Sequence, residues 1–561
     1  MRHMGRFLGG LAVTVSTAAA AQTLQGPELQ AASNFGQTWN PVVFEAARAE
    51  GITALRDELH WDYAERGGAY VYDHEILTYP DRLAEAGMTL TLIALGEHPD
   101  HDAGATPYTP EGVAAYAAFF AETARRFPAV TAVEVGNEMN SETFTAGPAR
   151  AADIEGRAGF YAALLKATHD AVRGGWPEER PEVRIIGGAA HSIPLAWFGA
   201  LSEDGAAAYM DAIALHPYTT APEQFRRQAA LMRAVPGFET LPLEITEIGT
   251  TDPAEAPALL LKTYCQTALA GATTLAWYPL NARGDGFVPL LEDDGTVTPV
   301  GRTWQMIRDE MQGRPLTDAA PDPFTYGCRF GDRALVLWGA PRALTLDDRA
   351  LRAVDLAGAP LTAPALSRDT PLVVLSDGPA PVLGETLHLG PQQVLADSFD
   401  QFAYPGTEPD AGPDGFDRFV RVGTERVDFT LGPGQQTGGV PWTPYLTTDR
   451  DGWLRMDAEF LQPSMWDGVP AEIVHAYTAP DAMNVAVEIR LAPSVESSDG
   501  LTVALLRNGD ALAETSLRSA TDLRLPPVAV QPGDVLEVVL GPGEAPQGDT
   551  SDYRITLRRA D

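Results

Sequence analysis

The 561-residue sequence has only two cysteines, Cys265 and Cys328. So small a number excludes a disulfide-rich scaffold and a metal cluster held by cysteines. The two residues are compatible with one disulfide in an oxidising compartment or with two separate buried thiols. The sequence leaves both readings open.

Basic residues are also scarce, since 40 Lys and Arg stand against 76 Asp and Glu and give a formal net charge of -36. Such a chain repels phosphate backbones and anionic lipid surfaces, so we expect no nucleic-acid partner. We interpret the acidity as a solubility feature of an exported protein. A preference for neutral over anionic substrates is a weaker corollary.

Long hydrophobic runs are missing after the N-terminus, where no stretch reaches the roughly 18 apolar residues that suggest a membrane span. The N-terminus has Arg2, His3 and Arg6 before an apolar segment, then small residues that match an A-x-A pattern near Ala21. These features are typical of a secretory signal peptide. We predict a signal peptide over 1–21, no membrane span after its cleavage, and a periplasmic or extracellular location. An uncleaved anchor is the alternative.

Short apolar segments alternate with amphipathic helical ones between about residues 31 and 315. The expected strands are 31–36, 52–61, 89–96, 130–138, 183–190, 211–218, 241–249 and 272–280. Eight βα units of this size favour a (β/α)8 TIM barrel over an open doubly wound sheet. The first strand–helix turn also lacks the G-x-G-x-x-G sequence of a dinucleotide site. We assign the barrel to 22–315 and expect its chemistry at the C-terminal ends of the strands.

The alternation of strands with helical segments ends near residue 316. Short strands separated by Gly, Pro and Asp turns predict a small β-sandwich over 316–394. A Gly-, Pro- and Asp-rich boundary then precedes an all-β, jelly-roll-like domain over 395–561. Four aromatic residues of this last domain could stack on sugars or pack in a core: Trp442, Tyr445, Trp453 and Trp466.

Two acidic residues end expected strands of the barrel. Glu138 closes VTAVEVGNE, in which Glu134, Gly136 and Glu138 share a face if side chains alternate. Glu247 closes the seventh strand. Strand ends meet at one rim of a barrel, so we expect these two carboxylates to converge there. If a bulge shifts the register of the seventh strand, Glu244 takes the place of Glu247.

These motifs resemble those of a known group of enzymes. GNE (136–138) and TE-x-G (246–249) are similar to the acid/base and nucleophile motifs of clan A retaining glycoside hydrolases. ALRDELHWDYAERGGAYVYD, LHPY and AWYPLN are similar to the second-, sixth- and eighth-strand regions of glycoside hydrolase family 39. The resemblance covers roughly residues 30–390 and includes the small β-domain after the barrel.

The resemblance implies a retaining glycosidase without a cofactor, in which Glu138 is the acid/base and Glu247 the nucleophile. Retention requires carboxyl groups about 5–5.5 Å apart. Proximity to Glu247 is expected to raise the pKa of Glu138 while Glu247 stays ionised.

Further residues receive roles around this pair. Asn137 is expected to bind the sugar 2-hydroxyl, Arg56 and Tyr218 to hold Glu247, Trp277 to stack on a sugar ring, and His216 to orient Glu138 or the substrate. The alternatives are a structural ion pair for Arg56, simple packing for Trp277 and a buried core histidine for His216.

The loop GEHPDHD (96–102) follows the third strand and clusters acidic residues with His98 and His101. Oxygen and nitrogen ligands of this kind could hold a divalent ion. Because consecutive loop residues seldom converge on one ion, we expect no metal site here. A substrate contact by His98 or Glu97 is the preferred interpretation.

The sequence thus predicts an exported retaining glycosidase that acts on a polysaccharide or oligosaccharide. Another clan A activity is the nearest rival, because one barrel fold hosts many substrates. A non-catalytic glycan-binding or exopolysaccharide-assembly protein is the alternative outside the enzymes. A metal-dependent hydrolase built on His98 and His101 is a third hypothesis.

Overall fold

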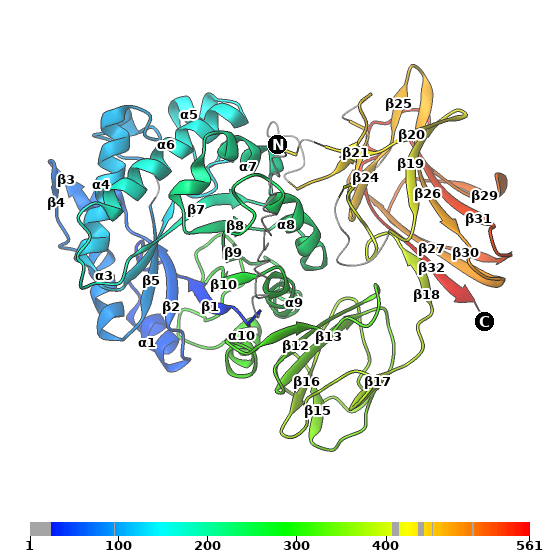
Figure 1. The fold of residues 1–561 in the computed structure, drawn as a ribbon, viewed down its shortest axis with the longest axis horizontal. Coiled ribbons are helices and arrows are strands. Elements are labelled where there is room, and N and C mark those ends of the chain that lie inside the picture. The colour runs from blue at the N-terminus through cyan, green and yellow to red at the C-terminus, as the bar shows by residue number, and fades with distance from the viewer. Residues whose placement is uncertain are drawn as a thin grey trace, which may run out of the picture.

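The computed structural model describes residues 24–560 apart from 95, 407–413, 433, 436–442, 451–452, 496 and 498. The predicted signal peptide and Trp442 therefore lie outside the described residues. Figure 1 shows three parts in chain order: a barrel wrapped by helices, a small group of strands beside it, and a large pair of sheets at the C-terminal end.

Eight parallel strands close into a barrel in the order β1-β10-β9-β8-β7-β6-β5-β2. The strands are β1 (Glu28–Ala32), β2 (Ala54–Glu58), β5 (Thr89–Ala94), β6 (Val130–Val135), β7 (Arg184–His191), β8 (Ala212–His216), β9 (Leu243–Ile248) and β10 (Ala272–Trp277). The predicted (β/α)8 fold is confirmed.

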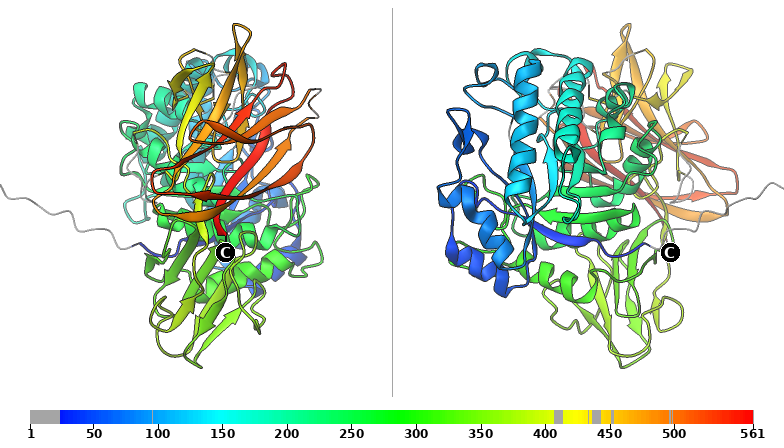
Figure 2. Two further views of the ribbon diagram at one scale, coloured as in Figure 1. Left: turned by 90° about the vertical axis from the view of Figure 1, so that its right-hand side faces the viewer. Right: turned by 60° about the vertical axis from the view of Figure 1, so that its left-hand side comes forward.

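The main helices surround this barrel (Figures 1 and 2). They are α1 (Pro41–Ala49), α3 (Glu75–Glu85), α4 (Pro110–Arg126), α6 (Ile154–Arg173), α7 (Leu195–Glu203), α8 (Phe225–Arg233), α9 (Ala256–Leu269) and α10 (Pro299–Glu310). Shorter elements lie in the connections: α2 (Trp61–Ala64), β3 (Glu65–Arg66), β4 (Ala69–Tyr70), α5 (Gly147–Ala151) and the 3-10 helices η1 (Asp102–Gly104), η2 (Ala206–Tyr209) and η3 (Pro222–Gln224).

Local signals explain where several helices begin. The side chains of Asn40, Thr109, Asp153 and Thr298 accept backbone N–H groups at the starts of α1, α4, α6 and α10. Such caps satisfy donors that a helix leaves unpaired. Pro follows directly in α1, α4 and α10, where its fixed φ suits the first helical turn.

The first strand lies earlier than predicted, at Glu28–Ala32 in place of 31–36. The segment after it turns, because the backbone N–H groups of Gln37 and Thr38 both donate to the carbonyl of Asn34. Asp57 fixes this turn by accepting from the Ser33 hydroxyl and from the Phe35 N–H at 2.7 Å. The Ser33 hydroxyl and the Phe35 N–H therefore bind Asp57 of β2, and the chain turns away after β1 ends at Ala32.

Small and polar side chains fill the inside of the barrel. Ala132, Ala212 and Ala214 form a small buried cluster there with Ile186 and Ala189. Many barrels carry bulky branched residues at such positions. Small residues here leave room for charged side chains that reach across the interior.

The chain after the barrel forms antiparallel sheets. A five-stranded sheet has the order β11-β12-β13-β16-β15, and β14 pairs with β17. Their bounds are β11 (Leu316–Asp318), β12 (Thr325–Phe330), β13 (Ala334–Gly339), β14 (Leu344–Leu346), β15 (Leu351–Val354), β16 (Leu372–Ser376) and β17 (Leu387–Leu389). A disulfide joins Cys265 on α9 to Cys328 on β12, with their Cα atoms 5.8 Å apart.

Two further sheets share one hydrophobic core. One runs β21-β22-β23-β24-β32-β27-β30 with β18 on β32, and the other runs β20-β19-β26-β31-β28-β29 with β25 on β26. Their bounds are β18 (Val394–Asp397), β19 (Asp417–Val422), β20 (Glu425–Asp428), β21 (Thr430–Leu431), β22 (Leu446–Thr447), β23 (Arg455–Met456), β24 (Phe460–Gln462), β25 (Ser464–Trp466), β26 (Val469–Thr478), β27 (Met483–Pro493), β28 (Leu501–Arg507), β29 (Asp510–Leu517), β30 (Thr521–Val530), β31 (Val535–Gly541) and β32 (Ser551–Ala560).

The strand positions can be compared with the predicted domain limits, and the burial of the aromatic side chains with their predicted role in sugar binding. Because β18 begins at Val394 and pairs with β32, it crosses the boundary predicted at 395. The domain limits stay predictions. Tyr445 is buried and Trp466 packs on the core of the paired sheets, whereas Trp453 is 69% exposed. Sugar binding by this region also stays a prediction.

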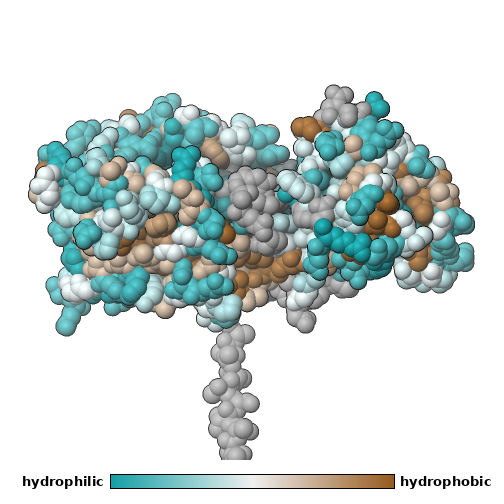
Figure 3. Space-filling view, turned by 90° about the horizontal axis from the view of Figure 1, so that it is seen from above, coloured by the Kyte–Doolittle hydropathy of each residue, from teal (hydrophilic) through white to brown (hydrophobic). Residues whose placement is uncertain are grey.

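The surface is mostly hydrophilic in the view from above, where the barrel and the paired sheets appear as two neighbouring lobes (Figure 3). Among the described residues, no helix combines the length and apolar character that a membrane crossing needs.

Candidate active site

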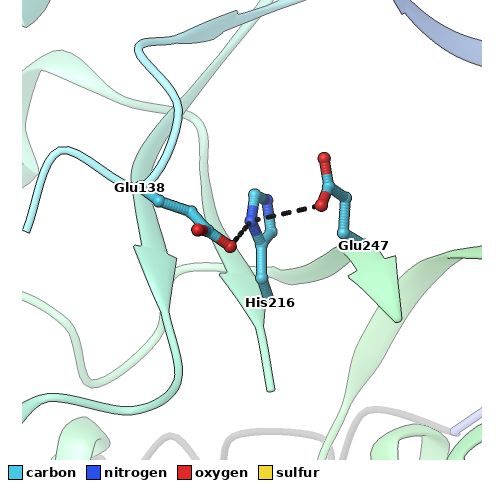
Figure 4. A group of neighbouring side chains, drawn as sticks. All are labelled: Glu138, His216 and Glu247. Atoms are coloured by element: carbon cyan, nitrogen blue, oxygen red, sulfur yellow. Dashed lines mark hydrogen bonds and ion pairs between the residues drawn. The ribbon is translucent and has the colours of Figure 1, made fainter. Parts of the chain in front are cut away.

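Three ionisable side chains converge at the C-terminal end of the barrel strands. Glu138 follows β6, His216 ends β8 and Glu247 lies near the end of β9. Figure 4 shows the imidazole of His216 between the two carboxylates, with all three side chains pointing toward one another. One oxygen of each carboxylate and one His216 nitrogen all lie within 4.8 Å of one another. The structure thus brings together the two acids that the sequence placed at strand ends.

A left-handed turn carries Glu138 into the mouth of the barrel. Gly136 has φ 72° and Glu138 has φ 45°, which is unusual backbone for a residue with a side chain. The turn closes through a hydrogen bond of 2.7 Å from the Ser141 N–H to the Glu138 carbonyl. The expected strand alternation therefore does not apply, because β6 already ends at Val135. Strained backbone of this kind clusters at functional sites.

A bulge in β9 brings Glu247 to the same mouth. Ile245 pairs with Leu275, but the next pairing joins Ile248 to Trp277, so β9 holds one extra residue. Both Thr246 and Glu247 consequently reach interior partners, since the Thr246 hydroxyl donates to Glu134 at 3.1 Å and Glu247 pairs with Arg56.

The alternative acid of this strand, Glu244, does not take part in the site. It forms an ion pair with Arg184, the first residue of β7, at the opposite end of the barrel strands. Burial raises the pKa of Glu244, although the Arg184 guanidinium opposes this. The structure therefore does not support the alternative in which a bulge puts Glu244 in the place of Glu247.

Arg56 connects the two acidic strands. Its Nε donates to Glu134 at 2.6 Å, its Nη2 donates to the Asn137 side-chain oxygen at 2.9 Å, and its Nη1 pairs with Glu247. Burial alone would lower the pKa of Arg56, but the charges of Glu134 and Glu247 outweigh it and raise this pKa. The guanidinium fork is thus a fixed cation that orients three side chains at once.

Tyr218 provides a second donor to Glu247. Its hydroxyl donates to the other carboxylate oxygen at 3.1 Å. Burial and the neighbouring Glu247 charge raise the pKa of Tyr218 well above its ordinary value, so the phenol keeps its proton. Its ring lies against His191 and Phe287, with centroid separations of 6.2 and 5.6 Å. These contacts fix the direction in which Glu247 points.

His216 is a buried cation in this cluster. Its Nδ1 lies 2.9 Å from Glu138, and its Nε2 lies 3.0 Å from the Thr246 hydroxyl and 3.3 Å from Glu134. Burial would lower the pKa of His216, but Glu247, Glu134 and Glu138 together raise it to about 9. The imidazole is therefore protonated at neutral pH and donates from both nitrogens.

The expected direction of the Glu138 pKa shift is wrong. Burial would raise this pKa, but hydrogen bonds from His191 at 3.3 Å and from His216 outweigh burial and lower it to about 2. The nearby negative charge of Glu247 was expected to have the largest effect on the pKa of Glu138. It does not, because the imidazolium of His216 lies closer to Glu138 and has the opposite sign.

Two residues predicted to bind substrate are packed in the protein interior. Trp277 is 0% exposed and its indole N–H donates to the Val288 carbonyl at 2.9 Å, so neither face of the ring is free for a sugar. His98 is 2% exposed, accepts from the Asp100 N–H at 3.1 Å and packs on Trp61. Other parts of the protein cover both side chains, and their contacts with substrate stay predictions.

The spacing of Glu138, His216 and Glu247 also fits a metal site. A histidine ligand must be neutral and must offer a lone pair to the ion. In the structure the two ring nitrogens of His216 lie within hydrogen-bond distance of Glu138 and Thr246 oxygens, so a metal ion here would have to displace a proton from Nδ1.

Three further residues contact the site but were not predicted from the sequence as site residues: Glu134, Thr246 and His191. A carboxylate in the middle of the apolar strand β6 was a usable signal for Glu134, because a buried charge needs a partner. His191 lies one residue beyond the strand predicted for 183–190. A bulge in β7, between the Gly187 and Ala190 pairings, redirects that strand end.

No protein-family model matches this chain, and no curated protein matches it. Among solved structures, a family 39 glycoside hydrolase from the gut symbiont Bacteroides cellulosilyticus WH2 is similar, with a TM-score of 0.51 and 17% identity over 63% of this chain and 81% of that chain. This similarity confirms that the resemblance seen in the sequence extends to the fold.

Two more solved structures are similar with lower scores. A family 39 β-xylosidase from Caulobacter crescentus has a TM-score of 0.45 and 17% identity, over 63% of this chain and 98% of that chain. A family 30 endoxylanase from Clostridium papyrosolvens C71 has a TM-score of 0.47 and 12% identity, over 64% and 98% respectively.

Proposed function

We propose that the protein is a retaining O-glycoside hydrolase that cleaves a polysaccharide or oligosaccharide. The observation that carries this proposal is the pair of carboxylates, Glu138 and Glu247, with one oxygen of each within 4.8 Å of the other at the barrel mouth. Retaining glycosidases hold their two carboxyl groups about 5–5.5 Å apart, whereas inverting enzymes need about 6.5–9.5 Å to admit a water. The close pair favours a double displacement.

Glu247 is the nucleophile in this proposal. Arg56 and Tyr218 bind its two oxygens separately, which stabilises the carboxylate and aims it. In the first step a Glu247 oxygen bonds to the anomeric carbon while the bond from that carbon to the leaving oxygen breaks. In the second step a water oxygen bonds to the same carbon and releases Glu247.

Glu138 is the acid and then the base. The leaving oxygen needs one proton, and we assign that proton to His216, whose pKa is raised to about 9 next to the Glu138 carboxylate. We propose that this proton moves from His216 Nδ1 to Glu138 when a sugar displaces water from the mouth, and from there to the leaving oxygen. In the second step Glu138 takes a proton from the attacking water, and the proton returns to His216.

Asn137 is proposed to bind the sugar hydroxyl beside the reacting carbon. Its side-chain oxygen already accepts from Arg56. The amide nitrogen is consequently the end that is oriented to donate to a substrate oxygen.

Export is part of the proposal. The Cys265–Cys328 disulfide supports it, because structural disulfides form mainly in oxidising compartments. Together with the predicted signal peptide over 1–21, this favours a periplasmic or extracellular enzyme. Cell fractionation with N-terminal sequencing of the mature protein tests this point directly.

The decisive experiment incubates the mature protein with a panel of polysaccharides and follows the first product anomer by NMR. We expect the anomer of the substrate to be retained. Glu247→Ala should lower kcat by at least about 1,000-fold while glycan binding persists. Glu203→Gln is the matched control, since Glu203 is an exposed carboxylate at the end of α7.

Two outcomes would overturn the proposal. An inverted first product would remove the nucleophile role of Glu247. A wild-type protein that binds glycans but releases no reducing ends would instead support a glycan-binding or exopolysaccharide-assembly protein.

A further inference from the structure

Gln435, which lies between β21 and β22 in the C-terminal part of the chain, reaches the barrel mouth. Figures 1 and 2 show the paired C-terminal sheets beside the barrel. Gln435 is 2% exposed. The preceding residue, Gly434, lies so close to the start of α7 that an added Cβ would stand 3.4 Å from the Leu195 nitrogen. The backbone at Gly434 is therefore packed on the start of α7.

The Gln435 amide forms a reciprocal pair with Asn140 of the barrel. Its nitrogen donates to the Asn140 backbone carbonyl at 2.7 Å, and its oxygen accepts from the Asn140 side-chain nitrogen at 3.0 Å. Asn140 is 0% exposed. Two neutral hydrogen bonds between buried amides fix both the distance and the rotation of the partners, and neither partner can turn to water if they are lost.

Asn140 is connected to Glu138 through the backbone. It lies two residues further on, within the turn that the Ser141 N–H closes onto the Glu138 carbonyl. The left-handed backbone at Glu138 persists only if its surroundings hold it. Arg157 of α6 holds the Asn140 carbonyl from the barrel side at 2.8 Å, and Gln435 holds the same carbonyl from the C-terminal part.

Asn140 is also connected to Glu138 through hydrogen bonds with His191. The Asn140 side chain accepts from the His191 N–H at 3.0 Å and donates to the His191 carbonyl at 3.1 Å. The His191 ring in turn lies 3.3 Å from the Glu138 carboxylate. Gln435 thus belongs to a buried network that fixes both the backbone and a hydrogen-bond partner of the acid/base residue.

We propose that Gln435 is a positioning residue for catalysis, through which the C-terminal β-sheet part completes an active site built on the barrel. It acts through Asn140 and His191 on Glu138. This inference rests on the proposed function for its catalytic consequence. The physical coupling between Gln435 and the turn at Glu138 can be measured without any substrate.

The test compares Gln435→Ala with Gln224→Ala in the full-length mature protein. Gln224 is a matched control, because it is also a buried amide joining the barrel to the later chain, through a hydrogen bond of 2.8 Å to the Phe399 carbonyl. Hydrogen–deuterium exchange of the peptide 136–145 gives the readout that needs no activity. We expect exchange in this peptide to rise at least about fivefold in Gln435→Ala and to stay unchanged in Gln224→Ala.

The kinetic arm uses the glycan identified by the substrate panel. We expect kcat to fall by about tenfold or more in Gln435→Ala with KM within about twofold, because small misplacements of an acid/base residue affect the chemical step. The pH dependence of kcat should shift, since the His191 contact is one cause of the lowered Glu138 pKa. A merely structural contact would lower stability without moving the pH profile.

A double variant shows whether Gln435 affects Glu138 through His191. If Gln435 acts through His191, the losses in Gln435→Ala and His191→Ala should not add, and the double variant should resemble His191→Ala alone. Unchanged exchange in 136–145, or equal changes in the Gln224→Ala control, would overturn the proposal. If no glycan is cleaved but exchange responds as expected, the proposed function fails while the coupling stands.

Discussion

At the scale of single residues, charge balance decides what the site can do. Arg56 and His216 bring two positive charges against the carboxylates of Glu134, Glu138 and Glu247. Buried charges persist only when each has a partner. His216 contacts all three acids, since its Nδ1 also lies 3.8 Å from Glu247. A rise in pH can therefore remove the proton of His216, and with it one of the two positive charges of the cluster.

We predict that stability falls as His216 loses this proton. Its pKa is raised from about 6.5 to about 9, so its contribution is fully present below pH 6.5 and is lost as pH rises through 9. The loss should amount to about 2–4 kcal/mol. Calorimetry from pH 6 to 10 should show a falling Tm for the wild type and a flatter curve for His216→Gln. Parallel curves would contradict the role of His216.

The second prediction concerns the shape of Arg56. Arg56→Lys keeps the charge but loses the fork that binds Glu134, Asn137 and Glu247 together. We expect stability to fall by about 2–4 kcal/mol in urea unfolding, because Glu134 is left buried with fewer donors. Activity on the identified glycan should fall by about 100-fold.

The matched control for Arg56→Lys is Arg48→Lys on α1. Arg48 pairs with Glu45 in an exposed position, where such ion pairs contribute less than about 1 kcal/mol. A loss in this control as large as that in Arg56→Lys would show that the effect is not specific to the site.

At the scale of helices and strands, the sequence was sufficient to locate the strand ends but not the final direction of each side chain. Their positions at strand ends predicted that Glu138 and Glu247 share one rim. The expected alternation fails at Glu138, because a left-handed turn follows β6, and a bulge in β9 redirects Glu247. Nothing local in ITEIG marks that bulge, which depends on the pairing with β10.

Burial was the property that the sequence could not predict at this scale. Trp277 and His98 occur in the right strand and loop, yet segments from elsewhere in the chain cover both. Gly136, in contrast, was visible in the sequence. Its positive φ explains why GNE needs a glycine at that position.

The third prediction tests this glycine. At Gly136, φ is 72° and an added Cβ would meet the Met139 sulfur at 2.8 Å. Gly136→Ala should therefore lower kcat by about tenfold or more and destabilise the protein by about 1–3 kcal/mol. Gly87→Ala is the control, because Gly87 has φ 70° but no atom within 4 Å of the added Cβ. It should lower stability by about 1 kcal/mol and leave kcat unchanged.

At the scale of the whole molecule, the segment 397–400 joins the three parts of the chain. Asp400 accepts from Arg227 of α8 through its carbonyl at 2.6 Å, and from Tyr326 of β12 through its carboxylate at 3.1 Å. The same carboxylate pairs with Arg368 at 2.5 Å and with Arg554 of β32 at 2.8 Å. The parts are therefore fixed to one another by buried polar contacts.

These junctions could not be predicted from the sequence, although the barrel and the later β-rich regions could. The alternation of strands and helices is a local pattern that repeats eight times. A junction such as Gln435 with Asn140 joins residues almost 300 positions apart and carries no periodicity. The pairing of Cys265 with Cys328 was open for the same reason, since spacing alone does not place two thiols together.

The last prediction concerns this disulfide, which links α9 of the barrel to β12 of the five-stranded sheet. A bond between residues 63 positions apart restricts the unfolded chain, so replacing both cysteines by alanine should lower the free energy of unfolding by about 3–4 kcal/mol. Because none of the described contacts of Glu138, His216 or Glu247 involves either cysteine, kcat in native buffer should stay within about twofold of the wild type. Urea unfolding of the wild type with reductant should reproduce the midpoint of the double variant. An unchanged midpoint in both would mean that the many polar contacts between these parts, and not the covalent link, hold the sheet against the barrel.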